Sequence, residues 1–146
     1  MDFFNSQYIT ESTRNDIRFG LIDDGLLARS TTKDEDRWLA EINNSQGKEI
    51  QFIPVDHNIK IFDGQNERSM CDGMLYDHEK TWIAFVEMKE QISEWMRDAR
   101  KQLESTINSF RDCHDIRLFK FRFAYAANRK HPHFQFSQKQ VMQEFY

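Results

Sequence analysis

The sequence predicts a mixed α+β fold, and three of its segments predict it. Residues 81–89 (TWIAFVEMK) form an apolar run rich in β-branched and aromatic residues, which is typical of a strand buried on both faces. Residues 92–112 repeat apolar side chains at spacings of three and four, which indicates an amphipathic helix of about five turns. Residues 116–128 alternate between apolar and basic side chains, which predicts a further strand with one basic face. We therefore expect an antiparallel β-meander, a long amphipathic helix and one more strand.

The 146 residues suit one domain spanning residues 1–146, with 39% apolar and 30% charged side chains. No run approaches the ~20 apolar residues that a membrane span needs, and the first residues lack the pattern of a secretory signal. The two cysteines, Cys71 and Cys113, make no disulfide framework. We expect a cytoplasmic protein with both thiols reduced and no membrane association.

The net charge of −4 is spread unevenly. Residues 1–80 hold 9 Lys/Arg against 16 Asp/Glu, whereas residues 81–146 hold 11 against 8. This asymmetry permits an anionic partner on the C-terminal half without requiring one.

The N-terminal half gives weaker signals. We expect a short helix within residues 10–19 and a loop over residues 21–36, which contain a Gly turn and a run of acids. Residues 37–44 are ambiguous: the preceding TKDE matches a helical capping box, but Trp38, Ala40 and Ile42 alternate as in a strand. The turn-rich NNSQGKE that follows favours a hairpin with a strand at residues 50–55.

The remaining elements follow in order. Residues 58–64 continue in extended form, and DGQNE makes a turn at residues 63–67. Residues 69–77 form a short strand, which the DHEK turn at residues 77–80 joins to the apolar strand. Ser93 is a suitable N-cap for the helix, and residues 133–146 add an edge strand or a packed tail.

Polar side chains end the apolar strand. Side chains alternate faces along a strand, so Glu87 and Lys89 point to one side and Met88 to the other. Pairing through the DHEK turn brings Asp72 to the same end of the sheet. Two convergent carboxylates with an ammonium beside them suit Mg²⁺, which takes one or two protein carboxylates and keeps waters for its substrate.

This pattern resembles the PD-(D/E)XK phosphodiesterase superfamily, with Asp72 as the first acid and Glu87-Met88-Lys89 as the E-x-K. Fourteen residues separate the two parts, and the resemblance covers about residues 48–126. It implies a restriction-endonuclease-like core, in which a helix, a three-stranded meander, a second helix and a further strand follow one another.

The resemblance also implies residue roles. Asp72, Glu87 and the backbone carbonyl of Met88 would bind Mg²⁺ or Mn²⁺, and Lys89 would position the attacking water or stabilise negative charge. Gln102 matches the glutamine that many members carry on the following helix.

Two positions depart from the family pattern. Cys71 stands where many members have proline before the first acid. Glu41 could match the glutamate that some members carry on the first helix, but only if residues 37–44 are helical.

Other sequence patterns are less informative about function. No CxxC or HxxxH spacing supports a zinc site around His131 or Cys113, and no P-loop or GxGxxG suggests a small-molecule cofactor. The best candidates for phosphate contacts are the basic residues of the last third: Arg117, Lys120, Arg122, Arg129 and Lys130.

Three functions follow as hypotheses. The first is a Mg²⁺-dependent nuclease that hydrolyses DNA in phage defence or DNA processing, as a homodimer or with a partner subunit. The second is an inactive nuclease-fold module that binds nucleic acid. The third is an immunity-type or defence-type interaction protein whose acidic residues face a basic partner: Asp23, Asp24, Asp34, Glu35 and Asp36.

Overall fold

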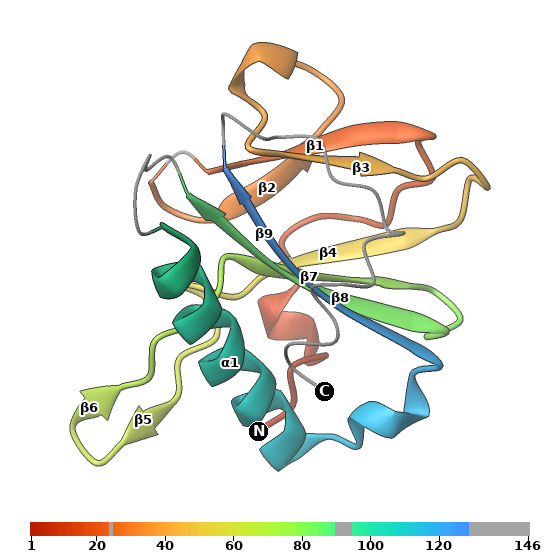
Figure 1. Ribbon diagram of the computed structural model, residues 1–146. Helices are drawn as coiled ribbons and strands as arrows, with labels where there is room; N and C mark the ends of the chain where they lie inside the picture. The colour runs from red at the N-terminus through yellow and green to blue at the C-terminus, as the bar shows by residue number, and fades with distance from the viewer. Residues whose placement is uncertain (24, 90–94, 129–146) are drawn as a thin grey trace.

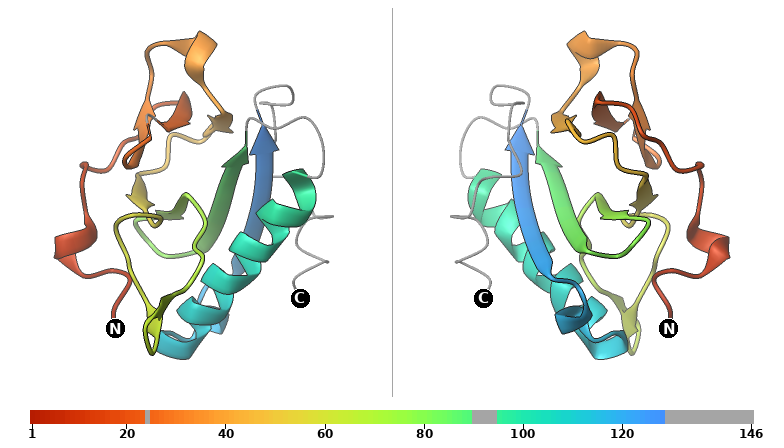
Figure 2. Two further views of the ribbon diagram at one scale, coloured as in Figure 1. Left: turned by 90° about the vertical axis from the view of Figure 1, so that its left-hand side faces the viewer. Right: turned by 90° about the vertical axis from the view of Figure 1, so that its right-hand side faces the viewer.

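The computed structural model describes residues 1–23, 25–89 and 95–128, which form three layers (Figures 1 and 2). The first layer is an antiparallel sheet of order β2-β1-β3, made of β1 (Arg18–Asp23), β2 (Ala28–Thr31) and β3 (Ala40–Asn43). The middle layer is a four-stranded sheet of order β4-β7-β8-β9. Helix α1 (Trp95–Cys113) covers its other face. The prediction of a mixed α+β fold is confirmed.

The central sheet consists of β4 (Ile50–Pro54), β7 (Gly73–Asp77), β8 (Trp82–Lys89) and β9 (Phe121–Asn128). Strands β4, β7 and β8 pair antiparallel in sequence order, which confirms the meander. Strand β9 pairs parallel to β8 because α1 returns the chain to the end of the sheet where β8 began. Meander, helix and final strand thus occur in the predicted order.

Strand β8 is buried on both faces, as its apolar run predicts. Ile83 and Phe85 pack with Phe110 of α1. The alternate residues Ala84 and Val86 pack between the two sheets. Each face of the central sheet therefore has its own apolar core, and β8 belongs to both.

Two predictions for the N-terminal region are wrong. Residues 10–19 form no helix: the short 3-10 helix is Ser6–Tyr8, Arg14 forms an isolated bridge with Ile50, and β1 begins at Arg18. The predicted loop over residues 21–36 is largely a hairpin of β1 and β2. The pairing of the two strands buries their apolar side chains against the central sheet, and this gain outweighs the local turn signals.

The ambiguous segment at residues 37–44 is a strand, β3, but its predicted partner is wrong. Strand β3 pairs with β1, whereas β4 belongs to the central sheet. The connection between β3 and β4 crosses from one sheet to the other. Asn44 stabilises this crossing because its side chain donates to the Lys48 carbonyl and accepts from the Lys48 amide.

The smaller elements agree in part with the predictions. Strands β5 (Phe62–Asp63) and β6 (Asn66–Glu67) form a short hairpin around the predicted DGQNE turn. The last strand is shorter than predicted, because residues Ile116–Leu118 form a 3-10 helix and β9 begins at Phe121. Several predictions lie outside the described residues: Asp24, the Ser93 cap, Arg129, Lys130, and the edge strand or tail at residues 133–146.

Candidate functional site

Asp72 and Glu87 lie side by side at one end of the central sheet. The antiparallel register pairs Gly73 with Val86, so Asp72, directly before β7, faces Glu87 on β8. The Asp72 amide donates to Glu87 Oε1 at 3.0 Å, and the Met88 amide donates to Asp72 Oδ2 at 2.6 Å. These reciprocal bonds confirm that the two predicted carboxylates converge.

The acid pair, Asp72 and Glu87, is removed from solvent. Asp72 is 8% exposed and Glu87 only 1%. Burial, together with the negative charge of Asp72, raises the pKa of Glu87 to about 9. Burial also raises the pKa of Asp72, partly opposed by its hydrogen bonds to Glu87 and to the Met88 amide. The metal-free pair therefore holds a proton at neutral pH.

Lys89 supplies positive charge beside the pair. Its Nζ lies 3.1 Å from Glu87 Oε2, on the same face of β8 as expected from the alternation. Met88 points to the opposite face and packs between the sheets. The Lys89 side chain keeps 19% of its surface exposed, so the ammonium lies at the border between the buried acids and solvent.

The backbone around Asp72 is held on both sides. The Cys71 amide donates to Thr106 Oγ1 of α1 at 2.6 Å. At Gly73, a Cβ atom would lie 2.4 Å from the Phe52 ring, so only glycine lets the strand pass there. Burial raises the pKa of the Cys71 thiol, which excludes it as a nucleophile at neutral pH.

Gln102 lies on α1 next to the segment that leads into Asp72. Its Nε2 approaches the Met70 carbonyl at 3.5 Å. Its Oε1 is buried and finds no hydrogen-bond partner among the described residues. The supporting role of Gln102 stays a prediction.

Two further acids act on the pair, and sequence reasoning did not connect them with it. The charges of Asp23 and Asp56 both raise the pKa of Asp72. Asp56 follows β4, where its amide donates to the Cys71 carbonyl, and Asp23 ends β1 in the other sheet. Asp23 and Asp56 are distant from Asp72 in the sequence, so no local pattern could reveal them. Within residues 1–23, 25–89 and 95–128, no group of three or more His, Cys, Asp or Glu is arranged to hold a metal.

Glu41 does not belong to this site. The helix on which its assignment depended is absent, since Glu41 lies on β3 in the other sheet. Its carboxylate pairs with the Arg18 guanidinium.

The predicted basic residues that the structure describes, Arg117, Lys120 and Arg122, lie toward the other end of the sheet. Phe121 pairs with Trp82, and Ala126 pairs with Glu87. Five residues of strand, about 17 Å, therefore separate the start of β9 from the acid pair. Arg117 is engaged by Asp115 at 2.9 Å, and Arg122 alone of the described basic residues lies within the strand. The fold therefore does not gather Arg117, Lys120 and Arg122 around Asp72.

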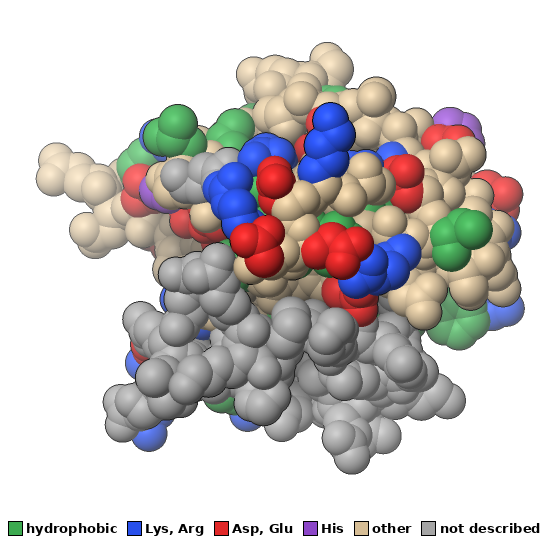
Figure 3. Space-filling model, turned by 90° about the horizontal axis from the view of Figure 1, so that it is seen from above, with side chains coloured by type: hydrophobic (Ala, Val, Ile, Leu, Met, Phe, Trp, Pro, Cys, Tyr) green, Lys and Arg blue, Asp and Glu red, His purple; other side chains and the backbone are tan. Residues whose placement is uncertain are grey.

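The described surface shows no broad field of one sign from above (Figure 3). Acidic and basic side chains are interspersed over the parts coloured by type. Any attraction of a charged partner to this face would therefore come from local groups.

Comparison with known proteins identifies no family for this chain. No protein-family model, no curated protein and no solved structure matches the chain. In the described part of the chain, no helix is long and apolar enough to cross a membrane.

Proposed function

We propose that the protein is a Mg²⁺-dependent nuclease of the PD-(D/E)XK type that hydrolyses phosphodiester bonds in DNA. The observation that carries the proposal is the reciprocal bonding of Asp72 and Glu87 with Lys89 beside them. The raised pKa values of the two buried carboxylates show that ionising both is costly without metal, and a divalent cation would displace the retained proton and stabilise both charges.

The donor set fits Mg²⁺ or Mn²⁺. Both acids offer hard oxygen ligands, and Mg²⁺ typically uses one or two carboxylates with waters in its other positions. When bound, the ion would polarise a phosphoryl oxygen and lower the pKa of a bound water. The Met88 amide orients the Asp72 carboxylate, and the Met88 carbonyl remains the proposed third protein ligand.

Lys89 has a separate role in this proposal. Its ammonium can swing from Glu87 toward a negatively charged phosphate, because the side chain is partly exposed. There the positive charge would stabilise the negative charge that develops in the transition state.

The order of the elements also supports the proposal. Strands β4, β7 and β8, helix α1 and the parallel strand β9 follow the order of a restriction-endonuclease-like core. The small β1–β3 sheet covers the face opposite α1, and the described chain departs from that core in having no α-helix ahead of the meander.

A cleavage assay tests the proposal. Purified protein should cut plasmid or oligonucleotide DNA with Mg²⁺ or Mn²⁺ and not with EDTA. Asp72→Asn and Glu87→Gln should abolish cutting, and Glu79→Gln, an exposed acid in the β7–β8 turn, should cut like wild type. Cleavage that survives both site variants would refute the proposal.

A second candidate is an inactive module on the same fold. The Glu87–Lys89 ion pair favours it, because the Lys89 ammonium already supplies positive charge that a bound cation would otherwise provide. Calorimetry with Mn²⁺ separates the candidates: the nuclease binds the ion through Asp72 and Glu87, and the inactive module binds DNA without it.

The assembly state is part of the proposal. By the same resemblance to small nucleases, we propose that the protein acts as a homodimer or with a partner subunit. Light scattering of the purified protein tests this, and a strict monomer that cuts DNA unaided would contradict it.

A further inference from the structure

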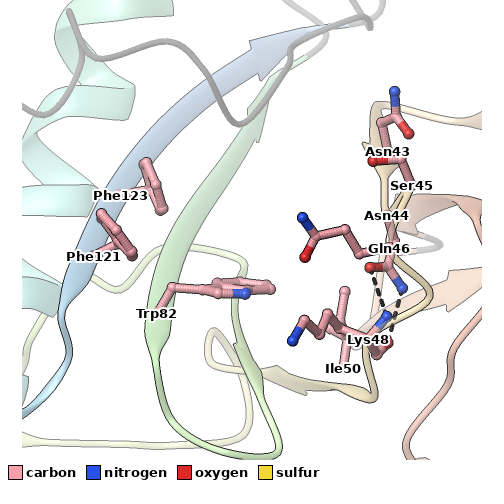
Figure 4. A pocket seen from close by; sticks show the side chains of 9 residues that line it. All are labelled: Asn43, Asn44, Ser45, Gln46, Lys48, Ile50, Trp82, Phe121 and Phe123. Carbon is pink, nitrogen blue, oxygen red and sulfur yellow. Dashed lines mark hydrogen bonds between the residues drawn. The ribbon is translucent and has the colours of Figure 1, made fainter.

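A hollow of about 210 Å³ lies between the β3–β4 connection and the start of strands β8 and β9 (Figure 4). One wall is aromatic, with Trp82 on β8 and Phe121 and Phe123 on β9. The facing wall is polar and includes Gln46 and Lys48. We call this hollow the aromatic pocket.

The aromatic pocket is separate from the acid pair. Trp82 lies on the face of β8 that packs toward the β1–β3 sheet, whereas Glu87 has the opposite parity and faces the α1 side. The two residues are also five positions apart, about 17 Å along the strand. A ligand in this pocket therefore would not touch the carboxylates.

The aromatic wall offers flat surfaces for stacking. Phe123 stacks on Tyr125 with an interplanar angle of 13° and a centroid separation of 5.8 Å, so the rigid core orients its ring. Phe121 lies beside Phe123 on the same face of β9 and is 48% exposed, which is high for so large an apolar side chain. Planar rings bind such surfaces with little sequence preference, since every nucleobase has a π-face.

The polar wall combines a fixed carboxamide with side chains that can adapt to a ligand. The Asn44 carboxamide is fixed, because it donates to the carbonyls of Asp16 and Lys48. Gln46 is exposed and points toward the aromatic wall (Figure 4), with a carboxamide that can both donate and accept. A donor and acceptor side by side match the edge of a nucleobase, and the Lys48 ammonium suits a phosphate.

We propose that the aromatic pocket binds a nucleotide, with its base against Phe121, the base edge at Gln46 and the phosphate at Lys48. The base can come from a free nucleotide or from an unpaired position of a nucleic-acid strand. The proposal does not depend on nuclease activity, because the pocket shares no residue with the acid pair.

Nuclear magnetic resonance of the ¹⁵N-labelled full chain tests the proposal. Adenosine monophosphate and a six-nucleotide oligo-dA should both shift the Trp82 indole N–H and the amides of residues 43–48. Phe121→Ala should weaken binding at least about fivefold, the lower end of what one stacked base contributes. Gln46→Ala should weaken it as well, without changing the fold, because both residues are exposed.

The source of the base follows from the same titrations. Tighter binding of the oligonucleotide than of the mononucleotide supports a nucleic-acid strand, and equal affinity supports a free nucleotide. Asp72→Asn should bind both ligands like wild type, whatever its effect on cleavage. The proposal is overturned if millimolar nucleotide shifts none of these signals, if ribose 5-phosphate binds equally well, or if Phe121→Ala binds unchanged.

Discussion

The two ends of strand β8 lie in regions of opposite character. At its C-terminal end, the ionisable groups of Glu87 and Lys89 are largely buried, and the charge of each depends on its neighbours. At its start, Trp82 borders a pocket whose Phe121 ring is half exposed. Buried charge is costly and strongly coupled, whereas an exposed aromatic surface is nearly neutral for folding. Substitutions at the first region should therefore change activity and stability, and those at the second should change binding alone.

The largest expected effect concerns Lys89 beside the acid pair. Lys89→Met should lower kcat for DNA cleavage by about 10²–10³-fold, as does loss of one preorganised charge-stabilising donor in other enzymes. Lys33→Met, an exposed lysine between β2 and β3, is the matched control and should leave kcat unchanged. Kinetics with Mg²⁺, with circular dichroism to verify folding, measure both. Equal losses in the two variants would contradict this role of Lys89.

A smaller effect is expected at Gly73. Gly73→Ala places a methyl group against the Phe52 ring and should destabilise the protein by about 1–3 kcal/mol, as overpacking does. Urea denaturation measures the change. Phe52→Leu in the same chain should recover part of the loss. If Gly73→Ala costs nothing, the backbone beside Asp72 is not held as tightly as the contacts indicate.

The pH dependence of stability should also distinguish the buried acid pair from exposed acids elsewhere. Without metal, Glu87 has a folded-state pKa of about 9 against an ordinary 4.5. Between these values the folded chain retains a proton that the unfolded chain has lost, so this group lowers stability as pH rises. Thermal melts in EDTA from pH 5 to 9 should show a weaker decline for Glu87→Gln than for wild type. Glu79→Gln should follow wild type, and parallel curves for all three proteins would contradict the buried acid pair.

The smallest effect is expected at the aromatic pocket. Phe121→Ala should change the free energy of unfolding by no more than about 0.5 kcal/mol, as is usual for surface substitutions. The same urea denaturation measures it. A loss above about 2 kcal/mol would mean that Phe121 belongs to the core instead.

The central sheet and the acid pair were predictable because their signals are local. The apolar run of residues 81–89 and the DHEK turn fix the β7–β8 pairing, and that register alone brings Asp72 to Glu87. Alternation along β8 then places Lys89 beside Glu87. The amphipathic spacing likewise located α1, although its described start is Trp95.

The β1–β3 sheet was not predictable from local signals. A glycine inside β1 argues against a strand, yet Gly20 is there because a Cβ would lie 2.0 Å from the Trp38 ring. The pairing of β3 with β1 skips the nearer β4, and so it depends on burial between the sheets rather than on a turn. The approach of Asp23 to Asp72 depends on that same arrangement.

The β7–β8 register has a consequence for the order of folding. Asp72 and Glu87 are joined within one hairpin, so only a short loop has to close before they meet. The aromatic pocket needs three separate parts of the chain, around Gln46, Trp82 and Phe121, and the last two meet only after α1 has brought β9 back to β8. Contacts of low sequence separation form fastest, so the acid pair should assemble early and the pocket late. On partial unfolding, loss of β9 would remove the pocket while the hairpin still holds its two acids together.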